Sequence, residues 1–283
     1  MNPPAIVDSH VHFWSPALLR YAWLDGLPAL NRDLLPGDFA VACRNSNVTK
    51  IIFVESGCLP AQNLAELDWI ARLAKGEPRL KGIIAQASLE RGALVRPDLD
   101  ALGLYSMVKG VRRNLQEESD PDFCLRANFI NGTRLLANAG FAFDLCIRAD
   151  QLPAVSELVR RVPEVSFVLD HLGKPDVRGS KREPWATGLK MLASSPNVCC
   201  KVSGLTTEAD WTHWHLDDLK FYFAWAVECF GFDRLLFGSD WPVATLATDY
   251  ERWIDTVAAL ASAATESERI KLFQTNAERT YHV

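Results

Sequence analysis

Short apolar runs recur along this chain, and each is followed by a stretch whose apolar residues are spaced as in a helix. The runs have the length and composition of strands buried on both faces, which is typical of a parallel sheet. They span residues 6–13, 50–55, 80–89, 108–113, 141–147, 165–171, 197–202 and 234–240. The alternation predicts an α/β fold, and eight units in 283 residues match a (β/α)8 TIM barrel better than a doubly wound sheet.

Helical spacing of leucine, isoleucine and alanine predicts the elements between these runs. We expect helices at 38–44, 64–74, around 99–102, and at 122–139, 152–161, 185–194 and 216–230, with two more closing the chain. Thr265 and Glu268 form a capping-box pattern that starts the last of them. No linker or repeat divides the sequence, so residues 1–283 are expected to form a single domain.

Composition and charge narrow the range of partners. A hydrophobic share of 48% is ordinary for a soluble globular protein, and the net charge of -5 argues against a general nucleic-acid binder. The seven cysteines follow no disulfide or CxxC spacing, so we expect buried thiols in a reducing compartment. We find no signal peptide and no membrane span, and expect a cytoplasmic monomer or homodimer that acts on a small molecule.

The chemistry of such a barrel lies at the carboxyl ends of its strands. The first run ends in His10-x-His12, and alternation on a strand predicts that both imidazoles, with Asp8 before them, share one face. Two imidazoles on one side bind a metal ion or polarise a carbonyl, although two ordinary histidines near the N-terminus are the simpler interpretation. The functional interpretation of His10 and His12 is favoured because further polar residues stand at the ends of the other strands.

Four more strand ends carry candidate groups. Asp240 is a candidate base or cation ligand, or else a turn cap; His171 is a candidate ligand or oxyanion donor, or else a core histidine. Only one of Arg112 and Arg113 can point inward; we favour Arg112 as a clamp on a carbonyl or carboxylate and keep Arg113 open. Glu55 is a candidate ligand, water-orienting group or ion-pair partner. Asp170 is expected on the opposite face, supporting the barrel wall.

Two aromatic segments are candidates for the walls of the pocket. One is the long loop 14–38, and the other is 205–215, after the seventh strand. Loops of this kind either cover a binding site or pack as surface structure, and the sequence leaves both open. We take three tryptophans as candidate substrate contacts: Trp14, Trp211 and Trp241.

Nearly the whole chain resembles the amidohydrolase superfamily, within it the branch of sugar-lactone hydrolases such as L-rhamnono- and L-fuconolactonases, related to 2-pyrone-4,6-dicarboxylate lactonase. The resemblance is carried, in order, by DSHVHFW (8–14), YAWL (21–24), KGVRRNLQ (109–116), FDLCIR (143–148), LDHLGKP (169–175), KVSGL (201–205), TEADW (207–211), FGSDWPV (237–243) and NAERTY (276–281).

The resemblance implies a barrel that opens a lactone ring with water. It makes Asp240, His171, His10 and His12 catalytic, with Arg112 as a substrate clamp. The fifth strand ends without a histidine and the fourth offers no bridging lysine, which argues against two metals. One divalent ion, Zn or Mn, on His10, His12 and Asp240, with Glu55 as a further candidate ligand, or no metal at all, stays open. Hydrolysis of a carboxylated aromatic-degradation lactone, decarboxylation and simple ligand binding are the alternatives.

Overall fold

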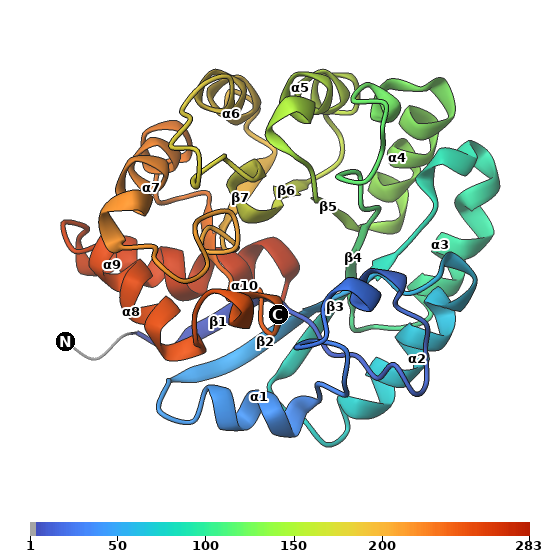
Figure 1. Cartoon of the computed structure of the whole chain (residues 1–283). Helices are drawn as coiled ribbons and strands as arrows, with labels where there is room; N and C mark the ends of the chain where they lie inside the picture. The colour runs from blue at the N-terminus through green and yellow to red at the C-terminus, as the bar shows by residue number, and fades with distance from the viewer. Residues whose placement is uncertain (1–3) are drawn as a thin grey trace.

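The computed structural model describes residues 4–283, and its eight strands form one parallel sheet in sequence order. The strands are β1 (Ile6–Val11), β2 (Val48–Val54), β3 (Leu80–Gln86), β4 (Val108–Arg112), β5 (Ala142–Leu145), β6 (Phe167–Leu169), β7 (Val198–Val202) and β8 (Leu235–Phe237). A parallel bridge joins Val11 to Trp241, so the end of β1 meets the segment that follows β8. The predicted (β/α)8 barrel is confirmed (Figure 1).

Helices follow the strands and surround the barrel (Figure 1). They are α1 (Pro36–Ala42), α2 (Asn63–Leu73), α3 (Arg96–Gly103), α4 (Ala127–Ala139), α5 (Leu152–Arg161), α6 (Trp185–Ala193), α7 (Leu216–Phe230), α8 (Tyr250–Leu260), α9 (Glu266–Ile270) and α10 (Asn276–Tyr281). Helix α5 shows the principle: Val155, Leu158 and Val159 are buried against the barrel, while the basic Arg160 in its last turn is exposed to solvent. Within residues 4–283 no helix is both long and apolar enough to cross a membrane.

Several predicted strands are shorter in the structure. β3 ends at Gln86 rather than at residue 89, β6 at Leu169 rather than at 171, and β8 at Phe237 rather than at 240. His171 and Asp240 have φ values of 53° and 59°, so the backbone has left the extended conformation before it reaches them. The expected helix at 122–139 is also interrupted, because Arg126 is extended and separates a short turn from α4.

The half of the barrel interior nearest the amino ends of the strands is apolar. Side chains from six strands meet there with two residues of the C-terminal helix: Val7, Ile52, Val54, Ile84, Ala142, Val168, Leu236, Ala277 and Tyr281. The ammonium of Lys50, near the start of β2, donates to the main-chain oxygen of Val283, so the chain end lies at the amino ends of the strands. Helix α10 therefore closes one end of the barrel and leaves the carboxyl end for chemistry. All seven cysteines are free thiols, and five of them are buried.

Candidate active site

His10 and His12 project from the end of β1 into the barrel. Between Asp8 and Val11 the pairing with β2 shifts, with three steps on β1 against two on β2, so β1 contains a bulge. Because of this bulge, the residues before it no longer alternate in phase with His10 and His12, and Asp8 points to the opposite face of the sheet. The carboxylate of Asp8 accepts hydrogen bonds from Ser239 N and from the hydroxyl of Tyr250 in α8, at 2.8 Å each. The expectation that Asp8 shares a face with the imidazoles is therefore wrong.

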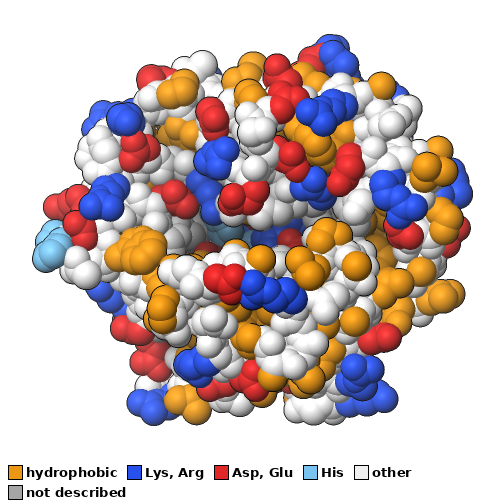
Figure 2. All heavy atoms as spheres, turned by 45° about the vertical axis from the view of Figure 1, so that its right-hand side comes forward, with side chains coloured by type: hydrophobic (Ala, Val, Ile, Leu, Met, Phe, Trp, Pro, Cys, Tyr) orange, Lys and Arg blue, Asp and Glu red, His pale blue; other side chains and the backbone are white. Residues whose placement is uncertain are grey.

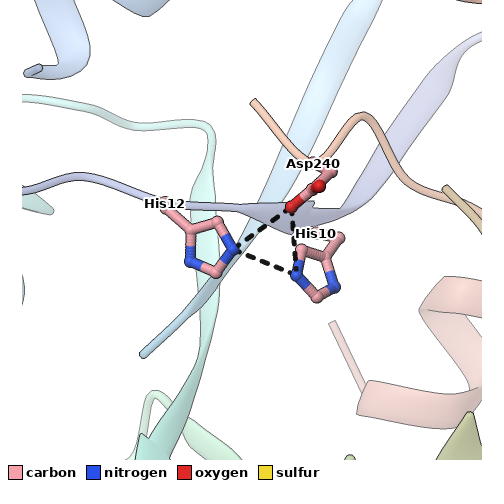
Figure 3. A group of neighbouring side chains, drawn as sticks. All are labelled: His10, His12 and Asp240. Atoms are coloured by element: carbon pink, nitrogen blue, oxygen red, sulfur yellow. Dashed lines mark hydrogen bonds and ion pairs between the residues drawn. The ribbon is translucent and has the colours of Figure 1, made fainter. Parts of the chain in front are cut away.

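Asp240 meets both imidazoles in the centre of the barrel (Figure 3). Its left-handed backbone is held by a hydrogen bond from its own N–H to the carbonyl of His10, at 2.9 Å. This turn aims the side chain inward. Asp240 Oδ1 lies 3.4 Å from Nε2 of His12, 3.7 Å from Nε2 of His10 and 3.9 Å from Nε2 of His171. One carboxylate oxygen is thus the meeting point of three imidazoles.

His171 reaches this point from a left-handed turn after β6. Its ring lies 4.5 Å from the ring of His10, and its Nδ1 is 2.9 Å from the hydroxyl of Ser203. Gly204 gives the ring its space, because a Cβ there would lie 2.7 Å from Nδ1 of His171 and the local φ is +62°. The sequence motif Lys-Val-Ser-Gly therefore supports the position of a histidine in the turn that follows the neighbouring strand.

The two arginines after β4 point in opposite directions. Arg112 is buried; its Nε donates to Glu55 Oε1 at 2.6 Å, and its guanidinium lies 3.5 Å from Nε2 of His10. Arg113 is turned outward by strand alternation and pairs with Glu90 and Glu118. The open prediction that Arg113 faces the pocket is therefore corrected: the inward residue is Arg112.

Glu55 lies beside the candidate metal ligands rather than among them. One carboxylate oxygen accepts from Arg112 and the other accepts from the N–H of Gly57 at 2.7 Å. Of the three alternatives for Glu55, this geometry corresponds to the ion-pair partner.

The candidate tryptophans lie outside the cluster of imidazoles. Trp14 is fully buried, and its indole N–H donates to the carbonyl of Leu30. Trp241 is 3% exposed and packs against Phe13 and Phe39. These two side chains have almost no surface left for a substrate, so the expectation of direct contact is corrected to core packing. Trp211 is 44% exposed, and its indole N–H donates to the carbonyl of Thr207 within its own loop.

A fully buried set of polar side chains, which we call the buried layer, lies next to His10. It consists of three charged groups, Asp144, Asp170 and Lys201, and the phenol of Tyr281. The ammonium of Lys201 lies 3.0 Å from Asp170 and 3.2 Å from Nδ1 of His10, and it also bonds to Asp144. The hydroxyl of Tyr281 donates to Asp144. All four side chains have zero exposure. The buried layer therefore holds the Nδ1 side of the His10 ring in place.

Sequence reasoning missed Lys201 and Asp144 and misplaced Asp170. Asp170 faces the interior because it stands two residues after Val168, which belongs to the inner apolar cluster. The phase of alternation was ambiguous because β6 is apolar on both faces. A usable signal did exist: Lys201 and Asp144 each stand within an apolar strand, and a charge buried there requires a partner.

The charge states follow from burial and neighbours. Burial raises the pKa of Asp240, but the imidazoles of His171, His12 and His10 lower it by more, so this pKa lies below the usual range. Burial lowers the pKa of His171 to about 4, and that of His10 well below its ordinary value. Lys201 keeps a raised pKa despite burial because Asp144 and Asp170 surround it. At neutral pH the cluster thus holds an ionised Asp240 beside the neutral imidazoles of His10 and His171.

The donor set fits one tetrahedral metal ion. Nδ1 of His12 lies 2.8 Å from the carbonyl of Val54 and must donate to it, so the neutral ring presents an unprotonated Nε2 to the centre. The Nε2 atoms of His10 and His12 are 3.1 Å apart, and Asp240 Oδ1 lies at 3.7 and 3.4 Å from them. Zn–N bonds of about 2.0–2.1 Å place tetrahedral ligands roughly 3.3 Å apart. These three atoms have that spacing.

The surface of the protein is hollowed above this cluster (Figure 2). A histidine side chain is visible inside the hollow, and acidic and basic side chains gather around it. The side chains of His12, His171 and Asp240 are each 6% exposed, whereas that of His10 has no exposure. Solvent therefore reaches the first three groups, and His10 supports them from beneath.

Comparison with known proteins identifies the family. The model of the amidohydrolase family matches residues 7–283. The chain belongs to the amidohydrolase family. It is 32% identical to the L-fucono-1,5-lactonase of Burkholderia multivorans over 97% of this chain and 95% of that protein. It is 25% identical to the L-rhamnono-gamma-lactonase of Scheffersomyces stipitis over 63% of this chain and 60% of that protein. The predicted resemblance is confirmed.

A solved structure shows the same architecture. An amidohydrolase from Burkholderia multivorans with bound zinc superposes with a TM-score of 0.89, at 30% identity, over 99% of this chain and 100% of that one. A more distant match is a structure titled as a 2-pyrone-4,6-dicarboxylic acid hydrolase of Pseudomonas putida, at 22% identity, a TM-score of 0.74, and coverage of 98% of this chain and 97% of that one; it shows a shared fold.

Proposed function

We propose that this protein hydrolyses a sugar (aldono-) lactone by attack of water on the lactone carbonyl. The observation that carries the proposal is the position of Asp240, whose Oδ1 lies within 3.9 Å of three imidazole nitrogens at the carboxyl end of the barrel. The similarity to lactonases of two organisms supports the same reaction class. A binding module would have no need for an ionised carboxylate placed among imidazoles in a solvent-accessible hollow.

Asp240 serves as the general base in this proposal. Its carboxylate accepts a proton from water as the water oxygen attacks the carbonyl carbon. When the tetrahedral intermediate collapses, the bond from the carbonyl carbon to the ring oxygen breaks, and Asp240 returns the proton to that oxygen. The product is an open hydroxy acid, which then ionises. The lowered pKa of Asp240 keeps it deprotonated and ready at neutral pH.

Arg112 and His171 stabilise the negative charge that develops on the carbonyl oxygen. The guanidinium is charged and held by Glu55, so little reorganisation is needed during the reaction. When the Ser203 hydroxyl donates to Nδ1 of His171, the neutral ring carries its proton on Nε2 and can donate it to the oxygen. A divalent ion, when held by His10, His12 and Asp240, supplies Lewis-acid polarisation and favours ionisation of water.

The structure weakens the case for a carboxylated lactone as substrate. Such a substrate needs several cations around the hollow, yet Arg113 is turned away and pairs with Glu90 and Glu118. Lys174 lies opposite the carboxylate of Glu208. We therefore place polyhydroxylated, uncharged lactones first. L-Fucono-1,5-lactone, L-rhamnonolactone and galactonolactones are the compounds to examine.

The experiment is a screen of a lactone library with a pH indicator, because ring opening releases one proton per turnover. We expect turnover of at least one aldonolactone well above the uncatalysed rate. A parallel measurement of carbon dioxide distinguishes decarboxylation. If no lactone is opened with or without added divalent cations, or if carbon dioxide is released, the proposal is wrong.

Metal content provides an independent readout. We propose that the purified protein carries about one zinc ion per chain on His10, His12 and Asp240, and that His12→Ala lowers this content. Elemental analysis of both proteins measures it without reference to activity. Exposed His213 provides the matched control variant, His213→Ala, which should keep the wild-type content. An equal metal content in all three proteins would contradict this ligand set.

A further inference from the structure

The segment after β6 forms a left-handed turn of four successive residues. The φ values are 53° at His171, 52° at Leu172, 70° at Gly173 and 53° at Lys174. Left-handed conformations cost residues other than glycine about 1–2 kcal/mol each, so such a run persists only where the surrounding structure enforces it. Three of the four residues here are not glycine.

This turn directs His171 and Lys174 to the same side. The N–H of Lys174 donates to the carbonyl of His171 at 2.9 Å, and in a turn of about three residues the first and fourth side chains lie above one another. Burial lowers the pKa of Lys174, but its anionic neighbours, among them Asp240 of the active site, raise it by more. Lys174 therefore lies at the rim of the same hollow.

Glu208 faces Lys174 from the loop that follows β7. The two loops are tied together by a hydrogen bond from Arg178 N to Glu208 O, at 2.9 Å. Asp240 also contributes to the electrostatic environment of Glu208. The side chains of Lys174 and Glu208 are 21% and 28% exposed, so the pair is half-buried and reached by solvent.

The Lys174–Glu208 pair differs from the other lysine ion pairs of the protein. Nζ of Lys174 lies 3.7 Å from Glu208 Oε1, which is longer than a hydrogen bond. Within residues 4–283, each other lysine that forms an ion pair approaches a carboxylate to 3.0 Å or less, as Lys50, Lys181, Lys201, Lys220 and Lys271 do. The ammonium of Lys174 and the carboxylate of Glu208 are therefore too far apart to hydrogen-bond to each other, which leaves a donor and an acceptor for a ligand.

We propose that Lys174 and Glu208 form the subsite that binds ring hydroxyl groups of the substrate, an inference that rests on the proposed lactone hydrolysis. A hydroxyl oxygen about 2.8 Å from both charged groups bridges the gap, accepting from the ammonium and donating to the carboxylate. A neutral hydroxyl is the ligand chemistry that uses both charges. A substrate carboxylate would be attracted by Lys174 but repelled by Glu208. The subsite thus selects polyhydroxylated lactones over charged or unsubstituted ones.

The test compares two substrates and five proteins. The substrates are L-fucono-1,5-lactone, which carries ring hydroxyls, and δ-valerolactone, which has the same ring size and none. The proteins are the wild type, Lys174→Met, Glu208→Gln and the control Lys220→Met, whose target is an exposed lysine paired with Asp217 on α7. Lys174→Arg, which keeps donors at the position, provides a fifth protein as a rescue variant.

We expect each subsite variant to lower the ratio of kcat/KM for the hydroxylated over the plain lactone by roughly 10- to 100-fold, mainly through KM, as expected for lost hydrogen bonds to charged groups. Lys174→Arg should recover part of the ratio, and Lys220→Met should leave it unchanged. If the ratio is unchanged in both subsite variants, including the case in which both substrates lose activity equally, the proposed subsite is wrong. The proposed lactone hydrolysis is unaffected by that result. A wild-type protein that opens no lactone of the library refutes the proposed function and the subsite with it.

Discussion

The buried layer and the rim of the hollow both consist of charged side chains, but they differ in how completely the charges are paired. Lys201 has zero exposure and contacts two carboxylates and an imidazole within about 3 Å. Lys174 is partly exposed and stays 3.7 Å from its partner. Lys174 follows β6 and Lys201 lies in β7, so the two lysines come from neighbouring units of the same barrel.

The difference separates structural from reactive polar groups. A charge inside the barrel is tolerated only when its partners are complete, because an unpaired ion there costs several kcal/mol. Groups at the solvent-reached end can keep unused donors and acceptors, and those are the groups that a substrate can engage. We therefore expect changes in the buried layer to act on stability and changes at the rim or at Asp240 to act on turnover.

The largest expected effect is that of Asp240→Asn. The amide keeps the shape of the side chain but cannot accept a proton from water, so kcat/KM should fall by about 10²- to 10⁴-fold while the melting temperature changes little. Activity is measured with the pH-indicator assay and folding by circular dichroism. Asp217→Asn, at a carboxylate that is 82% exposed, is the control and should behave as the wild type. Comparable turnover by the two variants would contradict the role of Asp240.

Next in size is the effect of Lys201→Met on stability. The substitution keeps the length of the side chain but leaves Asp144 and Asp170 buried without their cation. We expect the free energy of unfolding to fall by about 3–5 kcal/mol, measured by urea denaturation. Lys220→Met removes an exposed ion pair and should cost less than about 1 kcal/mol. Equal losses of unfolding free energy in Lys201→Met and Lys220→Met would show that the buried layer stabilises the fold no more than an exposed ion pair does.

Gly204→Ala should disturb both properties by a smaller amount. The local φ of +62° disfavours alanine by about 1–2 kcal/mol, and the new Cβ would lie 2.7 Å from Nδ1 of His171. We expect a modest loss of stability together with a lower kcat, because the imidazole must move. Gly103→Ala, where a Cβ meets nothing within 4 Å, is the control. A fully active Gly204→Ala protein would show that the ring position is not critical.

The last effect concerns pH and lies outside the active site. Glu66 on α2 is 2% exposed, and burial raises its pKa to about 8, with nearby Glu55 adding to the shift. The folded state then holds a proton that the unfolded chain releases near pH 4.5, so this group's contribution to stability falls as pH rises from about 4.5 to 8.

Glu66→Gln removes the ionisable group and should flatten this part of the stability profile, measured by urea unfolding at several pH values. Exposed Glu117→Gln is the control and should retain the wild-type slope. An unchanged slope in the Glu66 variant would show that Glu66 is ionised in the folded protein.

The sequence predicted the barrel because the spacing of apolar residues repeats eight times. It also indicated His10, His12, Arg112, His171 and Asp240, since each lies at the end of an apolar run, where the fold leaves polar groups without a packing role. These residues do meet in the structure, while their catalytic roles stay proposals. The expected Arg113 alternative failed because β4 carries apolar residues on both faces, so alternation alone does not fix its phase.

Local backbone geometry accounts for the features that sequence patterns could not give. The bulge in β1 turns Asp8 away from His10, and nothing in the run Ile-Val-Asp-Ser-His marks it. The left-handed turn at 171–174 brings Lys174 beside His171 through a conformation that non-glycine residues seldom adopt. The pairing of Lys201 with Asp144 joins β7 to β5, which lie on either side of β6 in the sheet, and this contact depends on the order and register of three strands.

The most direct test of the central claim is hydrolysis of L-fucono-1,5-lactone in ¹⁸O-labelled water by the wild type and by Asp240→Asn. The account predicts that the wild-type enzyme places one ¹⁸O atom in the product carboxylate and none in the hydroxyl formed from the ring oxygen. The Asp240→Asn protein should not exceed the uncatalysed rate by more than a small fraction of the wild-type gain. Label in that hydroxyl, or equal rates for both proteins, would contradict it.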